Sequence, residues 1–217
     1  MSSFLLPPMR LVVMAKAPLP GYAKTRLIPT LGEKGAAALA LQLLQDTLAE
    51  AVKADLGPVE LHAAPNSRHP FWQEFKLPQG VKLYSQSEGD LGQRLWRAAK
   101  SSYAAGQGFF LMGTDCPALN AERLRAAAVA LVHTDSVMYS ANDGGYTLLG
   151  LKYLHSRLFE DICWSTEVVA QQTLERLQEC DMQCQQLDVL ADIDDPEDLQ
   201  FLPGVLSRRL AGFREAD

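Results

Sequence analysis

The sequence predicts an α/β protein with a mostly parallel central sheet and helices on both faces. Short apolar runs alternate with helical patterns along the chain, an order that favours a parallel sheet. The first run, at residues 11–15, is continuously apolar, which is typical of a strand buried on both faces. With 217 residues, of which 47% are hydrophobic and 21% charged, the chain can form one sizeable core. We therefore expect a single domain over residues 1–217, with its core at about residues 9–203.

The first half of the chain begins with a strand expected at residues 11–15. A long helix follows at about residues 33–53, with four apolar side chains on one stripe: Leu41, Leu44, Leu48 and Val52. Two further strands are expected at residues 59–63 and 81–84. Asp90 can cap the next helix, whose inner face would hold Leu91, Leu95 and Ala98.

The second half begins with a strand at residues 109–112 and a helix capped by Asn120, with Leu124, Ala128 and Leu131 inward. Strands at residues 136–140 and 146–151 flank a turn, which predicts an antiparallel hairpin. Ser165 is expected to begin a helix that runs to about Gln178. Asp195 suits the N-cap of a last short helix, because a proline follows it.

Composition excludes several classes of protein. The formal net charge is -6 and no run of lysine and arginine occurs, which argues against a nucleic-acid binder. Four cysteines lack metal-ligand spacing and are expected to be free thiols: Cys116, Cys163, Cys180 and Cys184. The apolar patch at residues 4–6 is too short for a signal peptide, and no stretch approaches a membrane span. We expect a cytoplasmic protein without a membrane partner; its oligomeric state cannot be inferred from the sequence.

A basic loop leaves the first strand and carries Lys16, Lys24 and Arg26. Prolines stiffen this loop, and Gly21 permits close approach of its backbone to a ligand. In a parallel sheet, ligands bind outside the carboxyl ends of the strands, so these cations are placed to bind the phosphates of a nucleotide. A solvated basic loop is the alternative. The loop is not a P-loop, because no G-x-x-x-x-G-K-[ST] pattern occurs.

Acidic residues occur in two further segments. Asp115 follows the strand at residues 109–112, and Asp192 and Asp194 precede the last helix without a capping role. Carboxylates of this kind are ligands for Mg²⁺, whose remaining positions take water and phosphate oxygens. The alternative is that Asp115 bonds its own turn and that the other two are solvated.

Two weaker signals complete the set of candidate residues. Asp143 lies in the Asn-Asp-Gly-Gly turn, where a hairpin is sufficient explanation and a role toward an acceptor is secondary. In the segment at residues 89–94, capping explains Asp90 and leaves Arg94 as a further candidate for phosphate binding.

Five motifs in this order resemble a bacterial family of GT-A-type transferases, the DUF2064-like proteins associated with radical-SAM or selenium genes. They are K-x-P-x-P-G-x-x-K-T-R-L at residues 16–27, G-D-L-G-x-R at 89–94, G-x-D-x-P at 113–117, D-G-G-Y at 143–146 and D-I-D-x-x-x-D-L at 192–199. The first and last are also similar to those of 2-phospholactate guanylyltransferase and the molybdenum-cofactor nucleotidyltransferases. Gly113, however, stands where the first acid of a glycosyltransferase D-x-D would be.

The resemblance implies a GT-A fold and a role for each candidate residue. Lys16, Lys24 and Arg26 would meet donor phosphates, Asp115 and Asp194 would hold Mg²⁺ or Mn²⁺, and Asp143 would face the acceptor. Asp115, Asp143 and Lys24 are then the expected catalytic groups, with Asp192 as a further metal ligand.

The function expected from these residues is a metal-dependent transfer from a nucleotide donor to a small-molecule acceptor. Glycosyl transfer from a nucleotide-diphospho-sugar comes first, because the family carries that name. Nucleotidyl transfer to a phosphorylated or carboxylate acceptor, with release of pyrophosphate, is the alternative that the basic loop favours. A non-catalytic nucleotide-binding protein is the alternative from another class, because a fold alone does not prove activity.

Overall fold

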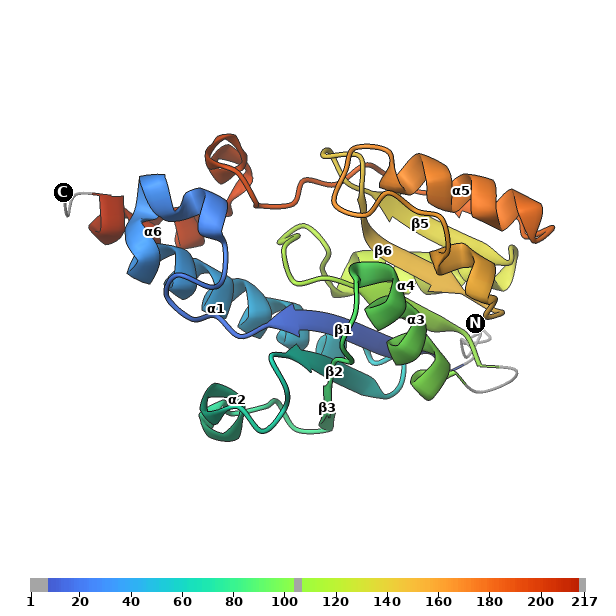
Figure 1. The fold of residues 1–217 in the computed structure, drawn as a ribbon, viewed down its shortest axis with the longest axis horizontal. Coiled ribbons are helices and arrows are strands. Elements are labelled where there is room, and N and C mark those ends of the chain that lie inside the picture. Colours follow the sequence, from blue (N-terminus) through green and yellow to red (C-terminus); the bar gives the residue numbers. More distant parts are fainter. Residues whose placement is uncertain (1–7, 104–106, 215–217) are drawn as a thin grey trace, which may run out of the picture.

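A computed structural model describes residues 8–103 and 107–214, and its centre is a seven-stranded sheet with the order β3-β2-β1-β4-β6-β5-β7 (Figure 1). The strands are β1 (Arg10–Lys16), β2 (Val59–Ala64), β3 (Val81–Ser85), β4 (Phe109–Met112), β5 (Ser136–Ser140), β6 (Tyr146–Leu151) and β7 (Cys184–Gln186). β6 is antiparallel to both of its neighbours, and all other pairings are parallel. The predicted fold class, including the antiparallel hairpin, is confirmed.

Helices cover both faces of this sheet. They are α1 (Ile28–Ala54), α2 (Pro70–Glu74), α3 (Leu91–Ser102), α4 (Ala121–Val132), α5 (Val169–Glu179) and α6 (Gly204–Arg214), with 3₁₀ turns η1 (Thr25–Leu27), η2 (Ser156–Phe159) and η3 (Pro196–Phe201). Alternate residues of β4 enter different cores: Phe110 joins α1 and α4 on one face, and Phe109 joins α3 and α5 on the other. The strand therefore has no solvent-facing side, which explains its unbroken apolar run.

The long first helix is confirmed from about residue 33, although its buried face differs from the expected stripe. α1 has an additional turn that begins at Ile28, and Gly32 separates this turn from the long part with a positive φ (65°) that favours glycine. Leu44 and Leu48 of the expected stripe are buried, but Val52 is 39% exposed. The buried face of the helix continues through Ala51 instead. The helix packs on both β1 and α4, so its buried face is broader than the single stripe that the sequence predicts.

The C-terminal third contains the largest errors of the sequence prediction. Ser165 does not begin a helix: its backbone is left-handed (φ 64°), and α5 starts four residues later at Val169. The short elements α2 and β7 were not predicted. Neither was α6, whose Leu206 and Leu210 are buried against α1, so packing extends beyond residue 203.

Other expectations concern caps and cysteines. The side chains of Asp90 and Asn120 accept the hydrogen bonds expected of N-caps, from the backbone N–H groups of Gln93 and Arg123. All four cysteines are free. The apolar patch at residues 4–6 lies outside the described residues. Among the helices of the described residues, none is long and apolar enough to cross a bilayer.

Strand direction determines where the candidate residues meet. β1 and β4 end at the same edge of the sheet, because they are parallel. The turn between β5 and β6 reaches that edge as well, since β6 is antiparallel to β4. The loop after β1, the segment after β4, the β5–β6 turn and the segment before η3 therefore converge there, and an isolated bridge from Ala141 to Leu190 fixes the last two together.

Candidate functional site

A cavity of about 690 Å³ opens at the carboxyl edge of the sheet. Its lining includes eight residues that the sequence singled out: Lys16, Lys24, Arg26, Arg94, Asp115, Asp143, Asp192 and Asp194. Gly21 is not among the lining residues; its φ of 73° turns the loop, and a Cβ there would lie 3.5 Å from Glu33 Oε1. Gly21 thus shapes the basic loop from outside the cavity, whereas the other candidates share one solvent-accessible space.

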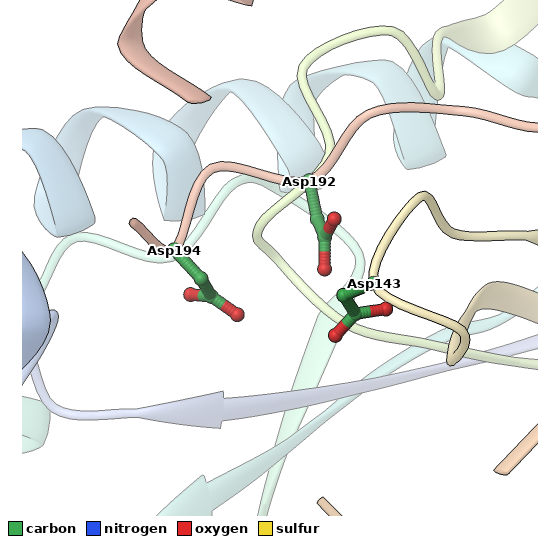
Figure 2. A group of neighbouring side chains, drawn as sticks. All are labelled: Asp143, Asp192 and Asp194. Atoms are coloured by element: carbon green, nitrogen blue, oxygen red, sulfur yellow. The ribbon is translucent and has the colours of Figure 1, made fainter. Parts of the chain in front are cut away.

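Three carboxylates gather in this cavity (Figure 2). Asp143 comes from the β5–β6 turn, and Asp192 and Asp194 come from the segment before η3. One oxygen of each lies within 4.8 Å of an oxygen of the others. Oxygens at about 2.1 Å from one Mg²⁺ ion are separated by distances of this order, so the set can hold a divalent cation. Asp115 is not a member of this group.

Asp192 is the carboxylate most affected by its surroundings. Burial raises its pKa to about 6, and the like charges of Asp143 and Asp194 act in the same direction. Within the described part of the chain, no lysine or arginine forms an ion pair with this carboxylate. The three acids therefore fit a bound cation, which would remove their mutual repulsion.

Lys24 is occupied by contacts within the protein. Its ammonium group forms ion pairs with Asp115 and with Asp194 Oδ1, the latter at 2.8 Å, and donates to the Ile193 carbonyl at 2.5 Å. Only 5% of its side chain is exposed. Burial alone would lower the pKa of Lys24, but attraction to the two carboxylates outweighs it and leaves the pKa raised. An ammonium group has three N–H donors, so all three are used here and none remains for a phosphate.

Asp115 and Asp194 thus share a cation in this structure, and that cation is Lys24. Their carboxylates are close neighbours, as expected of a pair with a common partner. The backbone brings them together, because the Ile193 N–H donates to the Asp115 carbonyl at 2.9 Å. The position of Asp194 is fixed further by Asp198, whose carboxylate accepts from the backbone N–H groups of Asp194 and Asp195 at 3.0 and 2.7 Å.

The remaining cations are more accessible. Lys16 ends β1 and is exposed, and its side chain has no hydrogen bond or ion pair within the described residues. Arg26 is 64% exposed and contacts Asp195 at 3.2 Å, an exposed pair that costs little to break. Arg94 donates to Gln86 Oε1 at 3.2 Å, while Gln86 donates to the carbonyls of Ala15 and His62. Lys16, Arg26 and Arg94 are therefore the cations available to an anionic ligand.

Sequence reasoning missed most of one wall of the cavity. Ser165, Thr166 and Glu167 line it beside Trp164, but the helix expected from Ser165 had placed these three residues on a helix surface. In the structure, two residues of this segment pack against distant glycines: Trp164 lies against Gly92, and Glu167 lies against Gly144. No spacing within the segment itself predicts contacts of that kind.

Comparison with known proteins identifies one family and several solved structures of similar fold. The model of a bacterial family, described as "Uncharacterized protein conserved in bacteria (DUF2064)", matches residues 47–166. A crystal structure from Desulfovibrio desulfuricans G20, provisionally named a nucleotide-diphospho-sugar transferase, is 27% identical with a TM-score of 0.82, over 95% of this chain and 90% of that one. No curated protein matches the chain in sequence.

More distant structures share the fold alone. The 4-diphosphocytidyl-2C-methyl-D-erythritol synthase of Anaerococcus prevotii DSM 20548 is 12% identical with a TM-score of 0.60, over 94% of this chain and 98% of that one. Rv0371c of Mycobacterium tuberculosis H37Rv, in a complex with manganese, is 16% identical with a TM-score of 0.54, over 95% and 98% of the two chains. The fold thus occurs in a protein that binds manganese and in a nucleotide-linked synthase.

Proposed function

Since the chain belongs to the DUF2064 family of bacterial proteins, and is similar over nearly its whole length to a provisional nucleotide-diphospho-sugar transferase, we propose that it transfers a sugar from a nucleotide-diphospho-sugar to a small acceptor, with a divalent cation. The broader class, a nucleotide-dependent transferase, agrees with the fold neighbours as well. The observation that carries the proposal is one cavity that holds a three-carboxylate group and three accessible cations.

Asp143, Asp192 and Asp194 would hold Mg²⁺ or Mn²⁺. The fit rests on the distances between their oxygens and on the raised pKa of Asp192, which a positive charge would lower again. When bound, the cation would neutralise charge that builds on the departing diphosphate. In this proposal Asp143 belongs to the metal site, rather than to the acceptor side alone.

Lys16, Arg26 and Arg94 would bind the diphosphate of the donor. Arginine offers a two-pronged donor for phosphate oxygens and lysine a point charge. Lys24 has a different role, because its three donors are used by Asp115, Asp194 and Ile193. It positions Asp194 beside the other two ligands and ties the basic loop to both acidic segments.

In the proposed reaction, a hydroxyl oxygen of the acceptor forms a bond to the anomeric carbon of the donor sugar. The bond between that carbon and the diphosphate oxygen breaks, and the nucleoside diphosphate leaves with the electron pair. The hydroxyl proton is released to solvent. The protein supplies orientation of the two substrates and fixed charges around the leaving group, which are the usual large contributions to such transfers.

Nucleotidyl transfer is the second candidate, and the number of cations in the cavity is compatible with it. Three accessible cations suit a triphosphate as well as a diphosphate. In that reaction an acceptor oxygen would attack the α-phosphorus of a nucleoside triphosphate, and pyrophosphate would leave.

Titration calorimetry with Mg²⁺ separates the two. We expect UDP, GDP or a nucleotide-sugar of one of them to bind at least about fivefold more tightly than the matching triphosphate, roughly 1 kcal/mol. Chromatography after incubation with the nucleotide-sugar that binds should show slow release of the nucleoside diphosphate, with water as the acceptor. Tighter binding of a triphosphate, together with pyrophosphate release once an acceptor is added, would replace sugar transfer by nucleotidyl transfer.

A further inference from the structure

The segment at residues 163–168 forms one wall of the cavity through its residues 164–167. It connects η2 to α5 without regular structure. The backbone N–H of Cys163 donates to Gln172 Oε1 at 2.7 Å, and the Thr166 hydroxyl donates to the Cys163 carbonyl at 2.6 Å. These bonds hold the segment in one conformation.

Two glycines let neighbouring elements approach this segment closely. A Cβ at Gly92, in the first turn of α3, would lie 2.3 Å from Trp164 Nε1. A Cβ at Gly144, in the β5–β6 turn, would lie 2.0 Å from the Glu167 carbonyl oxygen, and the Gly144 carbonyl accepts from the Ala170 N–H at 2.9 Å. The indole is therefore fixed against α3, while Glu167 is fixed against the turn that carries Asp143.

Ser165, between these two contacts, has a left-handed backbone (φ 64°). That conformation costs a serine free energy, and such strain is retained where the surroundings or a ligand require it. Trp164 is half-buried, whereas Ser165, Thr166 and Glu167 are exposed to the cavity. An apolar ring plane beside hydroxyl and carboxylate groups is the combination that binds the apolar face and the hydroxyls of a sugar-like molecule.

Positively and negatively charged residues lie in different regions of the cavity, and this separation determines the charge of the ligand that residues 164–167 can bind. The accessible cations are Lys16 at the end of β1, Arg26 in η1, and Arg94, whose guanidinium group contacts Gln86 after β3. Glu167 lies against the β5–β6 turn, on the side of the cavity away from those cations, and adds negative charge beside Trp164 that no proposed metal ligand shares. An anionic molecule is attracted to the first region and repelled by the second.

We infer that residues 164–167 form the acceptor subsite, and that the acceptor is a neutral or cationic hydroxyl compound with an apolar face. This inference rests on the proposed function, because it assigns the anionic donor to the cationic region. It excludes the phosphorylated and carboxylate acceptors that nucleotidyl transfer would use.

A matched pair of probes tests the inference: phenyl β-D-glucoside and phenyl β-D-glucuronide, which differ by one carboxylate. Their affinities are measured by saturation-transfer NMR on the full chain with Mg²⁺ and whichever of UDP and GDP binds. We expect the neutral glucoside to bind at least about fivefold more tightly. Glu167→Gln should reduce this preference to less than about twofold, since it removes the repelling charge, and Trp164→Ala should weaken both probes about tenfold.

Glu160→Gln is the control, because Glu160 is also exposed and precedes the same segment but does not line the cavity. It should leave the preference unchanged. Equal affinity for the two probes, tighter binding of the glucuronide, no binding of either at millimolar concentration, or an unchanged preference in Glu167→Gln would overturn the inference. Binding of UDP or GDP in the same samples keeps the two proposals apart: its absence counts against the proposed function, whereas loss of selectivity in its presence counts against the acceptor subsite alone.

Discussion

Glu60 and Asp192 lie near opposite ends of the same sheet, and their surroundings shift the pKa of each carboxyl group in opposite directions. Burial would raise the pKa of Glu60, but hydrogen bonds from His62, Ser102 and Arg10 lower it to about 2. Burial raises the pKa of Asp192 to about 6, and its carboxylate neighbours add to the effect. Glu60 is buried and Asp192 is half-buried, but burial acts in the same direction on both, so the opposite shifts come from their partners.

The partners of Glu60 are complete without any ligand. The carboxylate is 2% exposed, pairs with Arg10 and accepts from Ser102, while His62 Nε2 lies 3.4 Å away. Asp192 has like charges around it and no such set. A buried acid with complete partners contributes to stability, whereas one among like charges suits a site that receives a cation.

Among the variants that test this comparison, Glu60→Gln is expected to have the largest effect on the free energy of unfolding. An amide keeps the shape but leaves the Arg10 guanidinium group without its counter-charge, so the free energy of unfolding should fall by about 3 kcal/mol. Urea denaturation of the metal-free protein measures it. Asp192→Asn is the matched control and should lose nothing, because it removes a repelled charge. Similar losses in the two variants would erase the distinction between the two acids.

Lys24 and Lys16 provide a second, smaller test on the cationic side. Lys24→Met leaves Asp115 and Asp194 unpaired and should lower the free energy of unfolding by about 2 kcal/mol. Lys16→Met should change it by less than about 0.5 kcal/mol, because Lys16 is exposed.

The affinity for nucleotide tests the roles of Lys16 and Lys24 in a second way. Calorimetry with Mg²⁺ should show about tenfold weaker binding of UDP or GDP to Lys16→Met, from one lost charged contact. A stability loss from Lys16→Met equal to that from Lys24→Met, or unchanged nucleotide affinity in Lys16→Met, would show that these two lysines do not divide the roles of phosphate binding and positioning.

The pH dependence of stability should differ in sign between the two acids. For Glu60, the folded pKa of about 2 lies below the ordinary value of 4.5, so its contribution is present above pH 4.5 and is lost as the pH falls toward 2. For Asp192, the folded pKa of about 6 lies above the ordinary value of 3.8, so its contribution is present below pH 3.8 and is lost as the pH rises through 6.

A comparison of the metal-free wild type with metal-free Asp192→Asn isolates the pH-dependent contribution of Asp192 to stability. The difference in their free energy of unfolding, wild type minus variant, should decrease by about 1 kcal/mol between pH 4 and pH 7, a value reduced for partial solvent screening. Denaturation curves at several pH values measure it. A difference that stays constant over this range would mean that Asp192 is not surrounded by uncompensated charge.

The sequence predicted the sheet, because its evidence is local. The runs at β1 and β4 are apolar throughout, and Asp90 and Asn120 cap helices through residues three positions away. The convergence of the acidic and basic segments followed from strand direction, which the order of elements implies.

What the sequence could not provide are contacts between distant segments. Lys24 looked like a phosphate ligand because its loop is basic, but its partners lie about 90 and 170 positions away along the chain. Ser165 looked like a helix start, but its backbone is left-handed, and its neighbours Trp164 and Glu167 lie against the distant residues Gly92 and Gly144. α6 follows Pro203 without strong amphipathic periodicity, and its position depends on packing against α1.

Titration with Mn²⁺, followed by electron paramagnetic resonance of the free ion, tests most directly whether Asp143, Asp192 and Asp194 form a cation site. The account predicts one Mn²⁺ per chain, bound more tightly when UDP or GDP is present, and at least about tenfold weaker binding in Asp192→Asn and Asp194→Asn, roughly 1.4 kcal/mol. Asp188→Asn, a change at an exposed acid of the same segment outside the cavity, should leave the affinity unchanged. No Mn²⁺ binding at millimolar concentration with nucleotide, or equal affinity in all three variants, would contradict the account.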